Sequence, residues 1–93
     1  MIFEWDNNKY KANLKKHGVS FKDACLVFYD FNAVHFEDNK HSEKEARLNV
    51  IGYTPKGLLF VVYIERLKNG KYRMISARKA SKKEKSIYEK SQD

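Results

Sequence analysis

Three β-favouring runs follow one another between residues 46 and 78, and they constrain the fold more than any other feature. ARLNVIGYT and LLFVVYIER are separated by the turn residues Pro55-Lys-Gly57, and KYRMISAR follows Lys68-Asn-Gly70. Asn-Gly supplies the positive backbone angles of a tight hairpin. Consecutive strands joined by short turns predict an antiparallel sheet. The unbroken apolar character of LLFVVYIER predicts a central strand that is covered on both faces.

The N-terminal third predicts a short strand and two helices. The opening IFEW is β-favouring, and Asp6 can cap a helix over residues 7–17 that ends at Gly18. A second helix follows Ser20, where SFKD has the form of a capping box with Asp in the place of Glu. The apolar residues of this second helix recur with helical spacing and predict a buried stripe of Phe21, Ala24, Cys25 and Phe28.

The remaining elements complete an α+β class. A strand is expected near residues 33–37, and a second capping box, SKKE, starts a final helix that runs to about Lys90. Ile87 and Tyr88 are expected to face inward on that helix. The order β-α-α-β-β-β-β-α predicts a small antiparallel sheet with helices packed on one face. With 93 residues, the chain is expected to form one domain over residues 1–93.

Composition excludes several classes of protein. No apolar run approaches the roughly 18 residues that span a bilayer, and MIFEWDNNK lacks the pattern of a secretory signal. Cys25 is the one cysteine, so no internal disulfide can form, and a reducing cytoplasm is the expected compartment. The spacings of His17, His35 and His41 match no common zinc site. No metal and no other cofactor is therefore expected.

The formal net charge of +7 is concentrated in the second half of the chain. Residues 1–39 hold five cations and six acids (−1), whereas residues 40–93 hold fourteen cations and six acids (+8). Within residues 66–85, nine cations accompany a single acid, Glu84. Such a field attracts a polyanion, which can be nucleic acid, an acidic membrane surface or an acidic protein. The structural alternative is a solvated, lysine-rich face.

The basic segment also places three arginines on predicted strands. A hairpin joins the strand that ends at Arg66 to the strand of Arg73, so these two should be neighbours able to clamp one phosphodiester. Arg73 and Arg78 differ by five positions, and an unbroken strand would put them on opposite faces. They can share a site only if the strand ends or bulges before Arg78. Lysines surround the beginning of the final helix, where free N–H groups suit a phosphate: Lys79, Lys82 and Lys83.

Cleavage of RNA requires few chemical groups. A base takes the proton of the 2′-OH, cations stabilise the phosphorane, and an acid protonates the leaving 5′ oxygen. His17 ends the first helix, where the helix dipole favours its charged form, although packing beside Leu14 is the structural alternative. Tyr88 is a candidate acid or an inward-facing core residue. Trp5 can stack on a base or anchor the core, and Cys25 is expected to be a small buried hydrophobe.

Four motifs together resemble a known family. FEWDNNKYKANLKKHGVSF, EAR…IG, VVYIER and ISARKASKKEKSIYE are similar, in order and over nearly the whole chain, to the BrnT family of bacterial toxins. The resemblance implies a RelE-like fold and an endoribonuclease toxin of a type II toxin–antitoxin pair that needs no metal and stops translation. It also implies a BrnA-like antitoxin as partner, an RNA substrate, no membrane, and operator DNA bound only through the antitoxin complex.

The same motifs indicate which residues form the site. VVYIER and ISARKA make Arg66 and Arg78 the foremost catalytic candidates, KHG adds His17, and the closing YE adds Tyr88. Charge and position add the expected RNA-binding residues Arg73, Lys79, Lys82 and Lys83. Two other interpretations stay open at this point. One is a non-catalytic module that binds RNA or the ribosome, and the other is an interaction partner whose basic face meets an acidic antitoxin.

Overall fold

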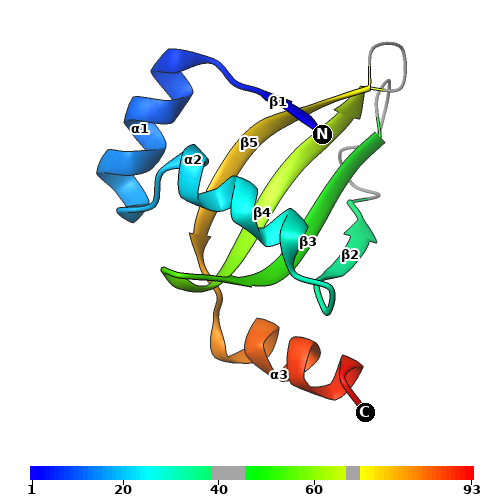
Figure 1. The fold of residues 1–93 in the computed structure, drawn as a ribbon. Coiled ribbons are helices and arrows are strands. Elements are labelled where there is room, and N and C mark those ends of the chain that lie inside the picture. The colour runs from blue at the N-terminus through cyan, green and yellow to red at the C-terminus, as the bar shows by residue number, and fades with distance from the viewer. Residues whose placement is uncertain (39–45, 67–69) are drawn as a thin grey trace.

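The structure is a computed structural model that describes residues 1–38, 46–66 and 70–93. Within these ranges the strands form a five-stranded sheet in the order β1-β5-β4-β3-β2 (Figure 1). The strands are β1 (Ile2–Glu4), β2 (Val34–Glu37), β3 (Ala46–Thr54), β4 (Gly57–Arg66) and β5 (Lys71–Lys79). The helices are α1 (Asn7–His17), α2 (Phe21–Ala24), the 3₁₀ helix η1 (Cys25–Tyr29) and α3 (Lys82–Ser91).

This arrangement confirms the α+β class and the central position of β4. β4 pairs antiparallel with β3 on one side and β5 on the other. The one parallel pairing joins β1 to β5. Most of the chain separates these two strands, so no tight hairpin imposes an antiparallel direction on them. The turn predicted at Lys68-Asn-Gly70 falls largely on residues 67–69, which lie outside the described residues.

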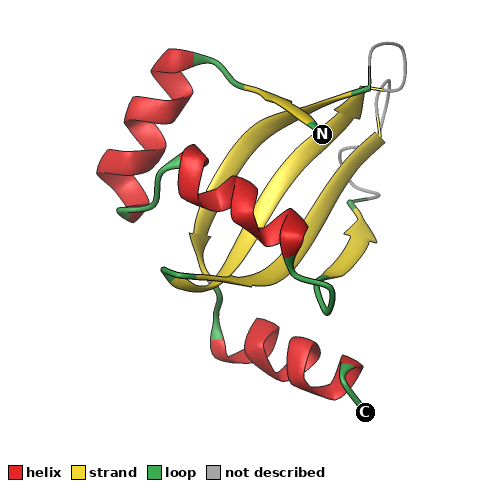
Figure 2. Cartoon of the chain, in the orientation of Figure 1, coloured by secondary structure: helices red, strands yellow, loops and turns green. Residues whose placement is uncertain are grey.

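The two faces of the sheet differ, and the prediction that both faces of β4 are covered is wrong. Leu59, Val61 and Tyr63 are buried in one core cluster with residues of α2 and η1. The alternate residues Phe60 and Val62 project to the other side and are only half-buried. The short helices α2 and η1 cover the first side, and α1 lies beside β5 at the edge of the sheet (Figure 2). The second side, to which Phe60 and Val62 project, is called the open face below.

The helix α3 lies past the ends of the strands and packs against the end of β3 (Figure 2). Its capping box forms as predicted, with Ser81 as the N-cap residue. Tyr88 is buried as predicted, but Ile87 is 39% exposed. Tyr88 is the buried residue of α3, and Glu84 adds a contact from the same helix to Arg78 of β5. Ile51, on the open side of β3, is fully buried at this end of the sheet.

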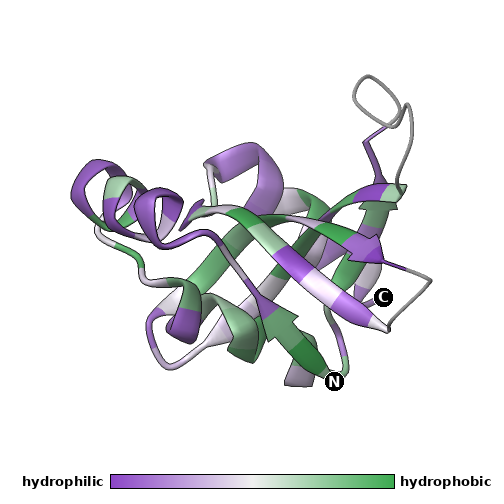
Figure 3. Cartoon of the chain, turned by 90° about the horizontal axis from the view of Figure 1, so that it is seen from above, coloured by the Kyte–Doolittle hydropathy of each residue, from purple (hydrophilic) through white to green (hydrophobic). Residues whose placement is uncertain are grey.

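A polar residue attaches α1 to the sheet. The helix is mostly hydrophilic (Figure 3), and its buried residue is Asn13, which is 7% exposed. The Asn13 amide donates to the carbonyl of Ala77 at 2.8 Å and accepts from the Ala77 N–H at 3.1 Å. It also donates to the carbonyl of Val19 at 3.0 Å. The strand β1 pairs with β5 only as far as Arg73. Beyond that point, the side-chain amide of Asn13 forms the two hydrogen bonds with Ala77 that a peptide group of a neighbouring strand would otherwise form.

The second predicted helix forms in two parts. It begins at Phe21 after the N-cap Ser20, as expected, but changes to a 3₁₀ helix at Cys25. The tighter winding turns Val27 fully into the core. Gly52 of β3 makes room for this approach, because a Cβ added there would lie 3.1 Å from both Cβ and the carbonyl oxygen of Val27.

Candidate functional site

A β-bulge in β5 decides which arginines share a face. Val62 pairs with Ser76, and the next residue of β4, Tyr63, pairs with Met74, so Ile75 is an extra residue in β5. Such a bulge shifts the alternation of side chains by one position. Arg73 and Arg78 therefore project from the same face. The sequence allowed this only if the strand ended or bulged before Arg78, and the bulge at Ile75 fulfils that condition.

The open face combines an apolar strip with cations. Phe60, Val62 and Ile64 run along the centre of β4 and are half-buried. The residues of β5 on this face include Lys71, Arg73 and Arg78, and Arg66 follows the strip at the end of β4. Half-buried apolar side chains and guanidinium groups both suit a single-stranded nucleic acid, because bases pack against apolar surface and phosphates pair with guanidinium groups.

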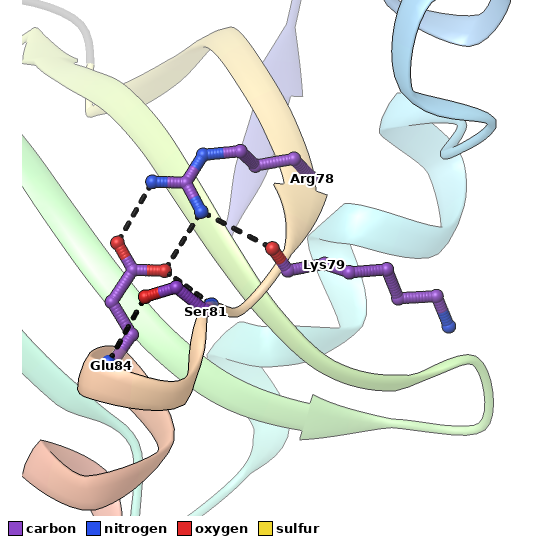
Figure 4. A network of polar contacts seen from close by, with 4 residues as sticks. All are labelled: Arg78, Lys79, Ser81 and Glu84. Carbon is purple, nitrogen blue, oxygen red and sulfur yellow. Dashed lines mark hydrogen bonds and ion pairs between the residues drawn. The ribbon is translucent and has the colours of Figure 1, made fainter.

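The guanidinium of Arg78 is held on three sides (Figure 4). Its Nη1 and Nη2 donate to Oε1 and Oε2 of Glu84, each at 2.8 Å. Nη1 also donates to the carbonyl of Lys79 at 3.2 Å, and the ring of Phe60 lies 4.4 Å beneath the guanidinium carbon. The bond to Glu84 raises the pKa of Arg78, although burial opposes it. For Glu84, burial favours a higher pKa, but the bonds from Arg78 and Ser81 prevail and lower it.

A second cluster lies at the far end of the open face. Oε1 of Glu4 lies 3.2 Å from Nε of Arg66 and 3.8 Å from Nη1 of Arg73. Arg66 pairs with Lys71, and Arg73 pairs with Ile64, so the two arginines are diagonal neighbours on the hairpin, as predicted. Glu4 escaped the sequence analysis because it reaches this place through the pairing of β1 with β5, which no local pattern reveals.

The two arginine clusters are too far apart to hold one phosphate. Arg78 pairs with Phe60, and Arg66 lies six residues further along β4. At about 3.3 Å per residue, this separates the two positions by ~20 Å. The end of the strand therefore does not bring Arg66 and Arg78 together as a clamp. A nucleic-acid strand of several nucleotides could contact both clusters, since stacked nucleotides rise about 3.4 Å each.

A comparison with protein families decides the identity of the chain. A family model described as "Ribonuclease toxin, BrnT, of type II toxin-antitoxin system" matches residues 5–84. The chain belongs to the BrnT family. It is a ribonuclease toxin of a type II toxin–antitoxin system, with the RelE-like fold that this family implies. Such a toxin has an RNA substrate and a cognate antitoxin. No curated protein matches the chain.

The lysines of this BrnT-family toxin do not all join the open face. Lys79 pairs with Leu59 and so projects to the opposite side, where its Nζ donates to the carbonyl of Lys56. Figure 4 shows its side chain extending away from Arg78. Lys82 and Lys83 are exposed in the first turn of α3, directly before Glu84 of the Arg78 cluster.

His17 lies at the end of α1 and not on a strand of the open face. This helix packs beside β5, and His17 is half-buried there. Leu14, beside which the structural alternative placed His17, is itself 44% exposed. In the described part of the chain, no hydrogen bond or ion pair joins His17 to Arg78. Trp5 packs against Tyr10 and Phe21 as a core anchor.

Tyr88 ties α3 to the loop after η1. Its hydroxyl donates to Oδ2 of Asp30 at 2.7 Å, and its ring meets the ring of Tyr53 edge-on at 5.3 Å. Burial and the contact with Asp30 raise the pKa of Tyr88 to about 12. Asp30 also accepts from the backbone N–H groups of Tyr53 and Asn32. These bonds favour the interpretation of Tyr88 as an inward-facing structural residue. They do not favour a catalytic acid that faces the arginines.

Replacing Tyr88 by phenylalanine should lower stability and leave RNA cleavage intact. The lost bond reaches a carboxylate, so we expect a loss of about 1.5–3 kcal/mol in the free energy of unfolding. Cleavage assayed at a temperature where both proteins are folded should stay within a factor of about two of the parent, because no reacting group is removed. Thermal unfolding and cleavage kinetics measure the two effects. A much slower reaction at unchanged stability would make Tyr88 a catalytic residue.

The contact between Tyr88 and Asp30 also predicts a pH dependence. Burial would raise the pKa of Asp30, but the donors Tyr53 N–H, Tyr88 hydroxyl and Asn32 N–H lower it. The unfolded chain therefore takes up a proton at Asp30 before the folded one does. This contribution to stability is complete above the ordinary aspartate pKa of about 3.9 and is lost as the pH falls through the folded value. The Tyr88→Phe protein should show a shallower acid decline.

A metal centre and a reactive thiol are two other kinds of chemistry to consider. In the part of the chain that the structure describes, no group of three or more His, Cys, Asp or Glu side chains is placed to hold a metal ion. His41 lies outside the described residues. Burial raises the pKa of Cys25 to about 11, so its thiol stays protonated at neutral pH. None of the helices described above is long and apolar enough to cross a membrane.

Proposed function

We propose that this toxin cleaves RNA on the open face without a metal ion and that Arg78 holds the scissile phosphate. The observation that carries the proposal is the fixed guanidinium of Arg78, which Glu84, Lys79 and Phe60 hold at the edge of a face lined by cations. A cation that is already in place when charge develops stabilises a transition state at no cost of reorganisation.

The chemistry requires no group outside the RNA and the protein. The 2′ oxygen loses its proton to a base and forms a bond to phosphorus, while the bond from phosphorus to the 5′ oxygen breaks and that oxygen gains a proton. The phosphorane between these steps carries additional negative charge on its oxygens. Arg78 is placed to neutralise this charge. The products are a 2′,3′-cyclic phosphate and a 5′-OH end.

The remaining cations of the open face would hold the rest of the RNA strand. Arg66 and Arg73 are ~20 Å and about 13 Å along the sheet from the position of Arg78, at about 3.3 Å per residue of strand. They suit phosphates several nucleotides away, and Lys82 and Lys83 suit phosphates beside α3. His17, Lys79 and Tyr88 stay outside this proposed site. His17 ends α1 beside β5, Lys79 projects to the opposite side of β5, and Tyr88 contacts Asp30.

The same face would account for control by the antitoxin. We propose that a BrnA-like antitoxin presents acidic residues to the open face and so competes with RNA, and that operator DNA binds only through the complex of the two proteins. Freed from it, the toxin would cleave RNA in the cytoplasm and stop translation. The excess of cations over acids in residues 66–85 supports this complementarity. A complex in which Arg66 and Arg78 stay exposed to solvent would contradict it.

The test is cleavage of a labelled RNA in EDTA, with analysis of the ends produced. We expect the purified toxin to cut in EDTA, to leave 2′,3′-cyclic phosphate and 5′-OH ends, and to spare an RNA that carries 2′-deoxyribose at the cut site. Cleavage that stops in EDTA and returns with Mg²⁺ would overturn the metal-free mechanism. Uncut RNA that is bound in a salt-dependent manner would favour the non-catalytic RNA- or ribosome-binding module.

A further inference from the structure

The structure assigns Glu84 as the positioning residue of this site, with the role of reserving one edge of the Arg78 guanidinium for an RNA phosphate. The inference rests on the proposed function of Arg78. Glu84 itself is not expected to touch RNA. Its carboxylate accepts hydrogen bonds from Nη1 and Nη2 of Arg78. The edge of the guanidinium that stays available for the phosphate faces away from this carboxylate.

Glu84 is held firmly enough to position another side chain. Its backbone N–H donates to Oγ of Ser81 at 3.2 Å, and its Oε1 accepts from the Ser81 N–H at 2.8 Å, which together form the capping box of α3. Its side chain is only 14% exposed. The start of α3 thereby fixes the carboxylate, and the carboxylate fixes Arg78 (Figure 4).

A count of donors shows which edge is reserved. A guanidinium has five N–H donors in one plane. Three of those in Arg78 are used, since both N–H groups of Nη1 donate, to Glu84 and to the Lys79 carbonyl, and one N–H of Nη2 donates to Glu84. The Nε–H and the second N–H of Nη2 remain, and they lie side by side on one edge of the plane. No residue in the described ranges accepts a hydrogen bond from this pair.

This remaining edge matches two oxygens of one phosphate. Parallel N–H groups of arginine bind phosphate in a bidentate manner, which sets both distance and orientation. The ring of Phe60 covers one flat side of the group, so the plane cannot tilt freely. Without Glu84, the side chain would keep its charge but could turn any edge toward RNA. The expected result is a loss in the rate of the chemical step and not in affinity.

The experiment compares Glu84→Gln with two controls on the same helix, Ser81→Ala and Glu89→Gln. Glutamine keeps the length of the side chain but provides one acceptor in place of two and no charge. We expect kcat to fall by roughly ten- to a hundredfold, with a KM for RNA that is unchanged or lower, because a negative charge near the RNA is gone. Ser81→Ala removes only the Oγ acceptor and keeps the backbone N–H that donates to Oε1 of Glu84, so it should reduce the melting temperature and leave kcat near that of the parent. Glu89→Gln removes an exposed charge and should change neither.

Two outcomes would overturn the assignment. One is a kcat for Glu84→Gln within about twofold of the parent. The other is an equal loss in Ser81→Ala, which would attribute the effect to the helix cap. A second readout does not depend on cleavage: the NMR signal of the Arg78 Nε–H, followed while a non-cleavable 2′-deoxy analogue is added. We expect this signal to shift in the parent and less in Glu84→Gln. An unshifted signal in the parent shows that the reserved edge does not bind phosphate.

These measurements test the proposed RNA cleavage at Arg78 and the positioning role of Glu84 separately. A parent that cleaves in EDTA, with Arg78→Ala inactive and Glu84→Gln fully active, leaves the proposed function standing and removes the role of Glu84. A parent that fails to cleave removes the proposed function. In that case a shift of the Arg78 Nε–H that Glu84→Gln reduces would still support positioning of Arg78 for phosphate binding.

Discussion

Replacing Arg78 by alanine should slow RNA cleavage by roughly 10²–10³-fold, the range found when one preorganised donor to a transition-state oxyanion is removed. The fold should persist, since Glu84 keeps its bond from the Ser81 N–H and α3 keeps its cap. Single-turnover kinetics with saturating toxin measure the chemical step directly. Circular dichroism and thermal unfolding then show whether the variant is folded under the conditions of the assay.

Arg78→Lys separates charge from geometry in the same experiment. Lysine keeps the positive charge but has no planar pair of donors, so we expect it to restore little of the lost rate. Lys11→Ala is the matched control for net charge, because Lys11 is an exposed cation of α1 and not a residue of the open face. Parental activity in Arg78→Lys would show that the positive field of the face suffices. An equal loss in Lys11→Ala would attribute the effect to net charge.

Replacing Asn13 by alanine should lower the free energy of unfolding by about 3–5 kcal/mol, the lower part of the range for three buried polar groups that lose a partner. The substitution leaves the N–H and carbonyl of Ala77 and the carbonyl of Val19 without this partner in a buried place, and each such group costs about 1–3 kcal/mol. For a domain of this size, the melting temperature falls by roughly 4–8 °C per kcal/mol. Chemical denaturation gives the free energy, with the slope as a check of two-state behaviour.

Asn8→Ala is the matched control, since Asn8 is exposed in the first turn of the same helix. It reports the gain in helix propensity that alanine brings to α1. Asn13→Asp should be at least as destabilising as Asn13→Ala, because a carboxylate can accept from Ala77 but cannot donate to either carbonyl. If Asn13→Ala and Asn8→Ala were equally stable, Asn13 would not be the anchor of α1.

The route of RNA across the open face follows from the two arginine clusters. Arg78 lies where β5 leads into α3, and Glu4 holds Arg66 near Arg73 at the other end of the same face. The apolar strip of β4 lies between them, with Val62 and Ile64 half-buried. A single strand that runs along β4 would meet a phosphate site at each end and apolar surface between, where bases can stack or pack.

The sequence by itself determined the elements and much of the site's composition. Capping by Asp6, Ser20 and Ser81 forms as predicted, because a cap needs only the residues within one turn. The bounds of β3, the central place of β4 and the meeting of Arg66 with Arg73 follow from β-favouring runs, from the unbroken apolar character of β4 and from short turns, which are local too. The basic segment indicated a polyanion partner, and four motifs indicated the BrnT family, which the family match confirms.

Only the tertiary structure decided how these parts combine. The bulge at Ile75 turns Arg78 to the face of Arg73, and a bulge depends on the fit of β5 against β4. Glu4 reaches Arg66 through the non-local pairing of β1 with β5. Asn13 resembles a solvated helix residue in the sequence, and its buried bonds exist only because α1 meets an unpaired edge of β5. Local rules act within a turn or a hairpin, whereas these contacts depend on where distant segments are packed.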